Sequence, residues 1–279
     1  MGPDLKVQRI LKRTSLVFRH STSRWRALPD FLIVGAQKAG TTFLYTSLIN
    51  HPDVLKAAKK EVRFFDVNYE RGEAWYRAHF PIRPRMGRTI RRRVISGEAS
   101  PFYLFHPAVP RRAGRIVPRA KIIAILRNPV DRAISSYYEA NSKGNEPLSL
   151  EGALLAEEER IRGERGRLLD DDSFWSTEYF NFTYKEKGKY INQLREWEGF
   201  YPRDQILVIQ AERLFSDTPS ALFEICDFLG IPPWALSSPG EMNARQYPPT
   251  PEHIRNYLED YFRPYNDQLF EYLGEEWDW

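Results

Sequence analysis

The stretch that decides the fold lies near the start of the chain and reads Phe31-Leu32-Ile33-Val34-Gly35-Ala36-Gln37-Lys38-Ala39-Gly40-Thr41-Thr42. Its first four residues form an apolar run with the length of a buried strand, and the pattern of residues 43–49 indicates a helix behind it. Glycines between the two let the backbone turn tightly, so that several N–H groups point inward beside the positive end of the helix. The stretch therefore predicts a strand, a phosphate-binding loop and a helix.

Two further apolar runs extend this pattern along the chain. Residues 121–126 and 205–210 have the length and composition of buried strands, and helical periodicity lies near them at residues 132–139 and 219–229. Strands that alternate with helices form α/β layers in which the sheet is largely parallel. We therefore expect an α/β fold with a central, largely parallel sheet flanked by helices.

Less regular segments lie between and after these elements. Residues 151–172 read as a polar helix followed by an exposed loop, and the Pro- and aromatic-rich segment from Pro232 onward is expected to wrap the core. Two stretches, residues 83–93 and 111–119, are rich in Arg. They predict either a cleft that attracts an anionic acceptor or a solvated basic face.

Composition excludes two broad classes of protein. The 279 residues are 42% hydrophobic and 14% aromatic at a net charge of only +4, so the chain has ample apolar surface for a core and is not disordered as a whole. Its longest apolar runs are far below the roughly 20 residues that a bilayer-spanning helix needs. Cys226 is the single cysteine, which excludes an intramolecular disulfide, and its apolar surroundings predict a buried thiol.

Positive charge is concentrated at the start of the chain. Residues 1–29 carry seven Lys and Arg side chains against Asp4, whereas residues 30–279 are expected to form one domain. The basic segment lacks the continuous apolar region and cleavage site of a secretory signal, so we expect a cytoplasmic protein. Two interpretations of the segment stay open: a helix that contacts a membrane surface or a partner, and a solvated, partly flexible terminus.

The phosphate-binding loop differs from that of nucleoside triphosphatases. Their order, G-x-x-x-x-G-K-[ST], places Lys after the second Gly and a hydroxyl on magnesium. Here Lys38 precedes Gly40, and the strand at residues 121–126 is followed by Arg127 instead of a metal-binding Asp. Both differences favour a phosphate site without a metal ion and argue against a rival class, the nucleotide kinases and triphosphatases.

A second signal follows the strand at residues 121–126 and reads Arg127-Asn128-Pro129-Val130-Asp131-Arg132-Ala133-Ile134-Ser135. Carboxyl ends of parallel strands are where α/β sheets bind ligands. Arg127 and Ser135, about two turns into the next helix, could hold a second phosphate from two sides. The alternative is a strand-end Arg paired with a carboxylate and a Ser that caps the helix.

Together, the two motifs resemble those of a known enzyme family. G-x-Q-K-x-G-T-T and R-[ND]-P-x-x-R-x-x-S are similar to the 5′-phosphosulfate loop and the 3′-phosphate motif of sulfotransferases that use 3′-phosphoadenosine 5′-phosphosulfate (PAPS). K-E-V-R-F-F-D (residues 60–66), G-E-A-S-P-F-Y (97–103) and Y-L-G-E-E-W-D-W (272–279) resemble the heparan sulfate subgroup, especially its 3-O- and N-sulfotransferases. The resemblance implies the sulfotransferase fold, with a P-loop-like phosphosulfate-binding loop.

The resemblance also implies roles for individual residues. Lys38 would stabilise the leaving phosphate, Arg127 and Ser135 would hold the 3′-phosphate, and Glu61 would act as the general base. The residues implied to contact the donor are Gly35, Gln37, Lys38, Ala39, Gly40, Thr41, Thr42, Arg127, Ser135, Tyr190 and Arg245. No metal is implied, and the nucleotide product would be adenosine 3′,5′-bisphosphate (PAP).

The chemistry explains why these residue types are needed. In an in-line displacement at sulfur, negative charge builds on the departing phosphate while the acceptor loses a proton, so a fixed cation and a fixed base are required. We expect the apolar Phe64 and Phe65 to desolvate Glu61. The alternatives are that Glu61 only pairs with a neighbouring cation, and that His106 is the base.

Three departures from the family leave the acceptor open. Ala99 replaces the Lys of a G-E-K-T-P segment, the family's K-G-R loop retains only Arg245, and the cysteine pair of the animal enzymes is absent. A carbohydrate hydroxyl or amine is the favoured acceptor, and the hydroxyl of a small molecule or lipid is the alternative. No motif supports specific nucleic-acid binding. The rival outside enzymes is a nucleotide- or polyanion-binding module without catalysis.

Overall fold

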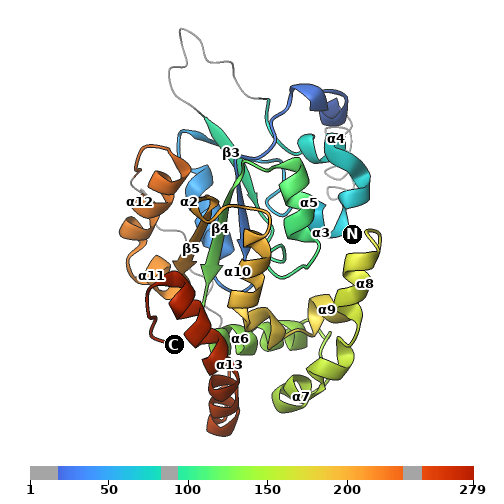
Figure 1. Cartoon of the computed structure of the whole chain (residues 1–279), viewed down its shortest axis with the longest axis vertical. Coiled ribbons are helices and arrows are strands. Elements are labelled where there is room, and N and C mark those ends of the chain that lie inside the picture. The colour runs from blue at the N-terminus through green and yellow to red at the C-terminus, as the bar shows by residue number, and fades with distance from the viewer. Residues whose placement is uncertain (1–17, 83–93, 235–246) are drawn as a thin grey trace, which may run out of the picture.

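One parallel sheet forms the centre of the protein (Figure 1), which is represented by a computed structural model that describes residues 18–82, 94–234 and 247–279. The five strands are β1 (Phe31–Gly35), β2 (Val54–Leu55), β3 (Ile95–Ala99), β4 (Lys121–Leu126) and β5 (Ile206–Gln210). They lie in the order β2-β3-β1-β4-β5, and every neighbouring pair is parallel. The predicted α/β fold is therefore confirmed.

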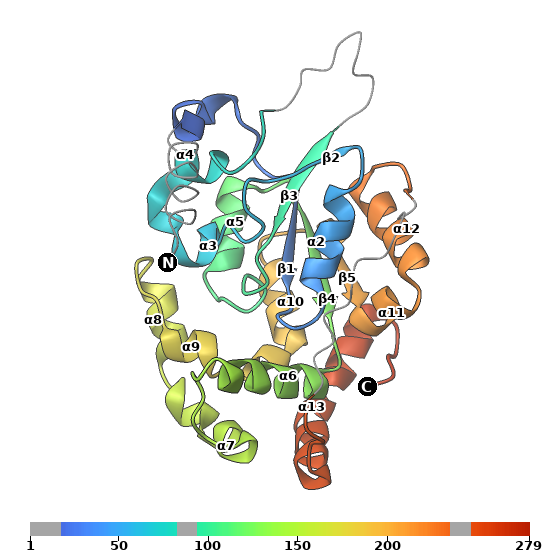
Figure 2. The same ribbon diagram turned by 180° about the vertical axis from the view of Figure 1, so that it is seen from behind.

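Helices cover both faces of this sheet. α2 and α12 lie over one face (Figure 2), and α5 and α10 lie over the other. The α-helices are α2 (Thr41–Ile49), α3 (Phe64–Val67), α4 (Gly72–Arg77), α5 (Val109–Ile116), α6 (Pro129–Ser142), α7 (Leu150–Arg160), α8 (Glu164–Asp170), α9 (Thr177–Asn181), α10 (Tyr190–Glu198), α11 (Ala211–Ser216), α12 (Thr218–Leu229) and α13 (Glu252–Leu273). Short 3₁₀ helices are η1 (Ser23–Trp25), η2 (Tyr69–Arg71), η3 (Glu186–Gly188) and η4 (Arg203–Gln205).

β1 and β4 are apolar along nearly their whole length because helices exclude water from both faces of the sheet. β1 is buried at every residue, and β4 is buried at every residue except Lys121. Ile33 of β1 lies beside Ala99 of β3 and beside Ile123 of β4. The carboxyl ends of these three strands are therefore neighbours, and α6 crosses beneath this edge of the sheet (Figure 2). The free Cys226 of α12 is buried, as predicted.

Most of the predicted helices are confirmed, with one correction. The periodic segments 132–139 and 219–229 are parts of α6 and α12. The expectation of an exposed loop after α7 was wrong. The chain turns at Gly163, whose φ is 78°, and enters α8, where Leu168 is buried in a small aromatic cluster. This apolar contact orders a segment whose sequence is otherwise polar.

The described C-terminal segment covers the molecule mainly with a long helix. α13 packs against α10 and α6. After α13, Trp277 and Trp279 pack on Phe270, with ring centroids 6.4 and 6.0 Å away. The segment that we expected to wrap the core is therefore a helix, α13, followed by a short stretch whose two Trp rings pack back onto that helix.

The chain before β1 is anchored in the part that the structure describes. Arg19 and Arg26 both donate hydrogen bonds to the carbonyl of Phe80 at 2.9 Å. Residues 1–17, which carry much of the basic segment, and the Arg-rich residues 83–93 lie outside the described residues. Within the three described ranges, no helix has the length and apolar character needed to span a bilayer.

Gly97→Ala tests how closely β3 packs on β1. A Cβ atom at Gly97 would lie 2.4 Å from the ring of Phe31, which is fully buried. We expect this substitution to lower the free energy of unfolding by about 1–3 kcal/mol, because the core cannot accept an extra carbon without displacing that ring. Urea denaturation measures the change.

Gly166→Ala in α8 is the matched control, since a Cβ atom there meets no atom within 4 Å. It should leave the free energy of unfolding unchanged or raise it by up to about 1 kcal/mol. Equal unfolding midpoints for Gly97→Ala and the wild type would show that β1 and β3 pack less tightly than described.

Candidate functional site

The loop after β1 follows the sheet before it turns. Gly35 ends β1, and the N–H of Ala36 donates to the carbonyl of Ile125 in β4 at 2.6 Å. The N–H of Ala39 then donates to the carbonyl of Ala36 at 3.2 Å, which closes a turn around the partly buried Gln37. β4 thus fixes the place where the loop leaves the sheet.

The chain enters α2 at Gly40, where glycine is required for two reasons. The φ of Gly40 is 96°, and a Cβ atom there would lie 2.5 Å from the ring of Phe215. Thr41 and Thr42 form the first turn of α2, whose main-chain N–H groups have no partner inside the helix and carry the positive end of its dipole. An anion at this helix start would meet several N–H donors.

Lys38 lies at the bend of the loop, and its side chain reaches α6. Its φ is 73°, a left-handed conformation that is uncommon outside glycine. Its Nζ lies 3.0 Å from Oε2 of Glu139, and Oε1 of Glu139 lies 2.7 Å from Nζ of Lys143. Burial raises the pKa of Glu139, but hydrogen bonds and charges from Lys143 and Lys38 outweigh burial and lower that pKa to about 2. Glu139 is therefore ionised at neutral pH and is shared by two lysines.

The Arg127–Ser135 motif begins at the end of β4, directly beside the loop. Nη1 of Arg127 donates to the carbonyl of Lys38 at 3.3 Å, so the structure brings the two predicted motifs together. Asn128, not Ser135, caps α6, because its Oδ1 accepts from the N–H of Val130 at 2.9 Å. Among the described residues, no carboxylate forms an ion pair with Arg127. In the described residues, Arg127 is therefore not paired with a carboxylate and Ser135 does not cap α6. The alternative interpretation of this motif is wrong.

Two buried side chains support this motif. Tyr190, at the start of α10, is 1% exposed, and its hydroxyl donates to the carbonyl of Arg127 at 2.8 Å. It orients the end of β4 and offers little surface to a ligand, although the resemblance implies that it contacts the donor. Arg132 is fully buried and donates to the carbonyl of Tyr184, which ties α6 to the segment before α10.

Ser135 has a partner that sequence reasoning missed. Its Oγ lies 3.1 Å from the hydroxyl of Tyr247, whose ring stacks on Tyr138 with centroids 4.8 Å apart. A signal was present in the sequence, because Tyr247 follows Arg245 by two positions in the segment that resembles the family's nucleotide loop. Arg245 itself lies outside the described residues.

Glu61 is connected to the phosphate-binding loop through Lys60. Nζ of Lys60 lies 3.2 Å from Oε1 of Glu61 and donates to Oγ1 of Thr42 at 2.5 Å. One cation thus joins the predicted base to the first turn of α2. The Glu61 side chain is 43% exposed, whereas Phe64 and Phe65 are fully buried in an aromatic cluster. The expectation that these two rings desolvate Glu61 was therefore wrong.

Burial removes His106 from the candidate bases. It is 1% exposed, and burial together with the charge of Arg112 lowers its pKa to about 3. Arg112, from the second Arg-rich stretch, is also buried and donates to the carbonyl of Phe65 at 2.7 Å and to Asp172 at 2.7 Å. Arg112 therefore connects α5 to Phe65 and Asp172. It neither lines an acceptor cleft nor lies on a solvated face.

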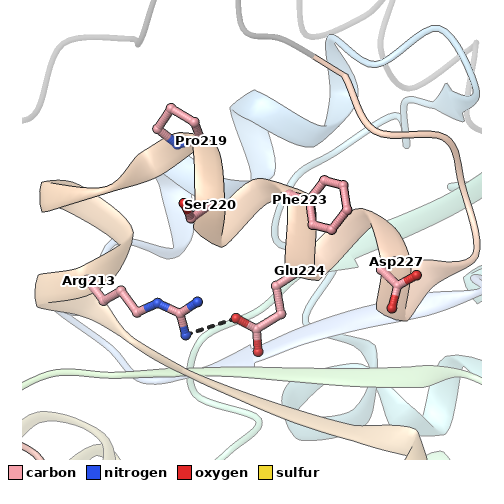
Figure 3. A pocket seen from close by; sticks show the side chains of 6 residues that line it. All are labelled: Arg213, Pro219, Ser220, Phe223, Glu224 and Asp227. Atoms are coloured by element: carbon pink, nitrogen blue, oxygen red, sulfur yellow. Dashed lines mark ion pairs between the residues drawn. The ribbon is translucent and has the colours of Figure 1, made fainter.

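A surface hollow between α11 and α12 contains none of the predicted site residues (Figure 3). It is lined by Arg213, Pro219, Ser220, Phe223, Glu224 and Asp227. Nη1 of Arg213 lies 2.9 Å from Oε2 of Glu224, so the cation of this hollow is already paired. The candidate site is therefore the carboxyl edge of the sheet, where β1 and β4 end.

Comparison with known proteins identifies the class to which the chain belongs. Residues 28–245 match the family described as the sulfotransferase domain. The chain therefore belongs to the sulfotransferase family and is an enzyme of that class.

Individual sulfotransferases are similar to this chain over most of its length. The chain is 31% identical to heparan sulfate glucosamine 3-O-sulfotransferase 6 of Homo sapiens, over 91% of this chain and 74% of that protein. It is 28% identical to the membrane-associated sulfotransferase kil1 of Dictyostelium discoideum, over 90% of this chain and 66% of that protein. A crystal structure of a sulfotransferase from Alicyclobacillus acidocaldarius matches with a TM-score of 0.69 and 28% identity, over 90% of this chain and 98% of that one. The sulfotransferase fold and the resemblance to the heparan sulfate subgroup are confirmed.

Glu139→Gln tests the ion pair that holds Lys38. Because the pKa of Glu139 is depressed to about 2 in the folded protein, its charge stabilises the fold above about pH 4.5, and this contribution is lost as the pH falls toward 2. The difference in unfolding free energy between wild type and variant should therefore shrink by about 1 kcal/mol from pH 6 to pH 3, allowing for solvent screening. Urea denaturation at each pH measures it.

Glu158→Gln, on the exposed side of α7, is the control for this series. The change between pH 6 and pH 3 should be larger for Glu139→Gln than for this control. Equal changes for the two variants would contradict the ion pair.

Proposed function

We propose that this sulfotransferase moves the sulfuryl group of PAPS to a hydroxyl or amine of an acceptor, with a carbohydrate as the favoured acceptor. The observation that supports the donor most is the meeting of two anion-binding motifs at one edge of the sheet, where Arg127 contacts the loop at Lys38. PAPS carries anionic groups at both its 5′ and 3′ positions, and each motif suits one of them. ATP has no 3′-phosphate and would leave the second motif unused.

In this proposal the loop after β1 holds the 5′-phosphosulfate, and the residues after β4 hold the 3′-phosphate. Arg127 fits this role because its guanidinium has no carboxylate partner in the described part of the chain. Ser135 adds a hydroxyl, Tyr190 supports the carbonyl of Arg127, and Arg245 stays a prediction from the resemblance. Around the 5′ group the proposed contacts are Gly35, Gln37, Lys38, Ala39, Gly40, Thr41 and Thr42. No step requires a metal ion.

The reaction replaces one sulfur–oxygen bond by another bond to sulfur. The bond between sulfur and the 5′-phosphate oxygen breaks with its electron pair on the phosphate, and the acceptor atom forms the new bond to sulfur. The acceptor's proton passes to the carboxylate of Glu61. Lys38 offsets the negative charge that develops on the departing phosphate. Because Lys60 contacts both Glu61 and Thr42, it links the proposed base to the first turn of α2.

The relatives support a carbohydrate acceptor, and one residue argues against assuming heparan sulfate itself. The human relative is named for the glucosamine of heparan sulfate. Ala99 stands where the resembling enzymes have Lys, and it is fully buried in β3. This chain therefore provides no cation at that position for an anionic acceptor. A less charged carbohydrate fits best, and the hydroxyl of a small molecule or lipid is the second candidate.

We further propose that residues 30–279 form one catalytic domain in a cytoplasmic protein and that the basic residues 1–29 contact a membrane surface. The Dictyostelium relative is named membrane-associated. At the described end of the basic segment, Phe18 and Trp25 are exposed, and the guanidinium of Arg24 lies 4.2 Å from the Trp25 ring centroid. Apolar rings next to basic side chains are typical of segments that bind anionic membrane surfaces.

Calorimetric titration with PAP tests the donor site. Wild type should bind PAP in the presence of a chelator and prefer it to ATP with magnesium. Arg127→Ala should weaken PAP binding by about 10–100-fold, because it removes charge-assisted hydrogen bonds to the 3′-phosphate. Arg213→Ala, which removes a guanidinium from the hollow between α11 and α12, should bind PAP like the wild type.

Preference for ATP with magnesium would favour the kinase or triphosphatase class. A folded wild type that binds neither nucleotide would contradict the proposed donor.

Glu61→Gln tests the base and separates an enzyme from a binding module. Turnover should fall by about 10²–10⁴-fold, because general base catalysis contributes a factor of this size. PAP affinity should stay within about threefold of wild type, since the proposed base does not contact the nucleotide. Radiolabelled sulfuryl transfer from PAPS to unsulfated and N-sulfated heparosan, and to a small phenol, measures turnover and compares acceptor classes.

Glu70→Gln, which changes an exposed carboxylate of η2 nine residues after Glu61, is the control and should keep full turnover. Equal losses of turnover and PAP affinity in Glu61→Gln would argue that this residue shapes the donor site instead.

A further inference from the structure

We propose that Glu98 is a positioning residue: its buried carboxylate fixes the backbone on which Glu61 stands. This inference rests on the proposed function of Glu61 as the base. On this proposal, the role of the G-E-A-S-P-F-Y segment is to support the base segment. It holds the K-E-V-R-F-F-D segment through hydrogen bonds.

The carboxylate of Glu98 is the centre of a set of four hydrogen bonds. Oε2 accepts from the N–H of Val62 at 3.1 Å and from Oγ of Ser100 at 2.8 Å. Oε1 accepts from the hydroxyl of Tyr76 at 2.6 Å and from that of Tyr103 at 3.2 Å. Glu98 is fully buried. Four donors match the acceptor capacity of an ionised carboxylate, which has no hydrogen to donate.

The same network continues along the base segment. Oγ of Ser100 accepts from the N–H of Arg63 at 3.2 Å. The hydroxyl of Tyr103 accepts from the N–H groups of Phe64 and Phe65, at 2.7 and 3.3 Å. Because Ser100 and Tyr103 donate to Glu98, their oxygen lone pairs are directed to these backbone groups. Four consecutive N–H groups directly after Glu61 are therefore bound by side chains of one other segment.

A main-chain contact completes the attachment on the other side of Glu61. The N–H of Ala99 donates to the carbonyl of Lys60 at 3.2 Å. Arg63 has a φ of 55°, so the segment is not a regular helix or strand that its own hydrogen bonds would fix. The conformation that presents Glu61 is thus set by its partners in and after β3.

The network is costly because no cation pairs with Glu98 among the described residues, which argues for a role in geometry. Burial raises the pKa of Glu98 to about 7, although hydrogen bonds from Tyr76, Ser100 and Val62 act in the opposite direction. The titratable groups that face it are Tyr76 of α4, Tyr103, Tyr45 of α2 and Asp66 of α3, and the carboxylate of Asp66 is itself paired with Arg63. A buried carboxylate of this kind contributes little to stability, but removing its charge leaves donors unpaired.

Protonation and substitution by Gln have the same consequence for the base segment. Either change puts a hydrogen on the side chain among four groups that already donate. At least one of the four then loses its acceptor, and the backbone of residues 62–65 loosens. Below about pH 7 the backbone of residues 62–65 should therefore be less ordered in the wild type. In Glu98→Gln it should be less ordered at every pH.

Hydrogen exchange at the amides of residues 62–65, followed by NMR without any nucleotide, tests the proposal. Their protection factors should fall at least tenfold in Glu98→Gln at pH 8, where the wild type is protected. In the wild type, protection should rise as the pH increases through about 7, and this dependence should vanish in the variant. PAP affinity should stay within about threefold, while turnover with PAPS should fall at least tenfold.

Glu146→Gln is the control, because Glu146 is another buried carboxylate that accepts from a tyrosine hydroxyl and a backbone N–H, although it is also paired with Arg160. It lies between α6 and α7 and should lower stability without changing protection at residues 62–65. Tyr76→Phe provides a second variant in case Glu98→Gln does not fold. It removes one hydrogen bond that favours the ionised form, so it should move the pH-dependent rise in protection to higher pH.

The outcomes separate this inference from the proposed function. Amides 62–65 that stay protected in Glu98→Gln, or a pH-dependent rise that Tyr76→Phe does not move, would overturn the positioning role. A wild type that shows the expected exchange but neither binds PAP nor transfers sulfuryl groups would overturn the proposed function and leave the hydrogen-bond network established. Loss of turnover together with loss of PAP affinity in Glu98→Gln would also contradict the positioning role, since it would place the effect in the donor site.

Discussion

The parallel pairing of β1 with β4 is the constraint on which the site depends. The two strands lie side by side with their carboxyl ends at one edge, and the hydrogen bond from Ala36 to Ile125 continues the pairing into the loop. The predicted phosphate-binding loop and the Arg127–Ser135 motif are about 90 residues apart in sequence, yet Arg127 contacts the carbonyl of Lys38. A ligand with two anionic groups needs this proximity, and neither motif could supply it alone.

β3 adds the support for the proposed base on the opposite flank of β1. Its pairing with β1 places Glu98 and the residues after it against the segment that carries Glu61. Lys60 then reaches from this segment to Thr42 at the start of α2. Each of the three central strands therefore carries one part of the proposed site. β1 leads into the loop at residues 36–40, β4 into the Arg127–Ser135 motif, and β3 into the residues that support the proposed base.

Local patterns in the sequence were sufficient for the α/β class, the loop and most helices, because strand length, glycine positions and periodicity are properties of short stretches. Long-range contacts were not accessible in this way. Glu139 pairs with Lys38 across about 100 residues, and Tyr247 reaches Ser135 from the far end of the chain. The expectation for Phe64 and Phe65 failed for the same reason. Their hydrophobicity was correctly taken as a sign of burial, but the direction in which they are buried depends on a cluster assembled from other segments.

The alternation of side chains in β3 separates two requirements that the sequence places next to each other. Glu98 and Ser100 both reach the segment after Glu61, so they lie on one side of the strand, and Ala99 between them faces the other. Evolution can therefore change position 99, where the resembling enzymes carry a cation, without disturbing the hydrogen bonds on either side of it. On the proposed function, acceptor preference and the geometry of the base segment could then change independently of one another within a three-residue stretch.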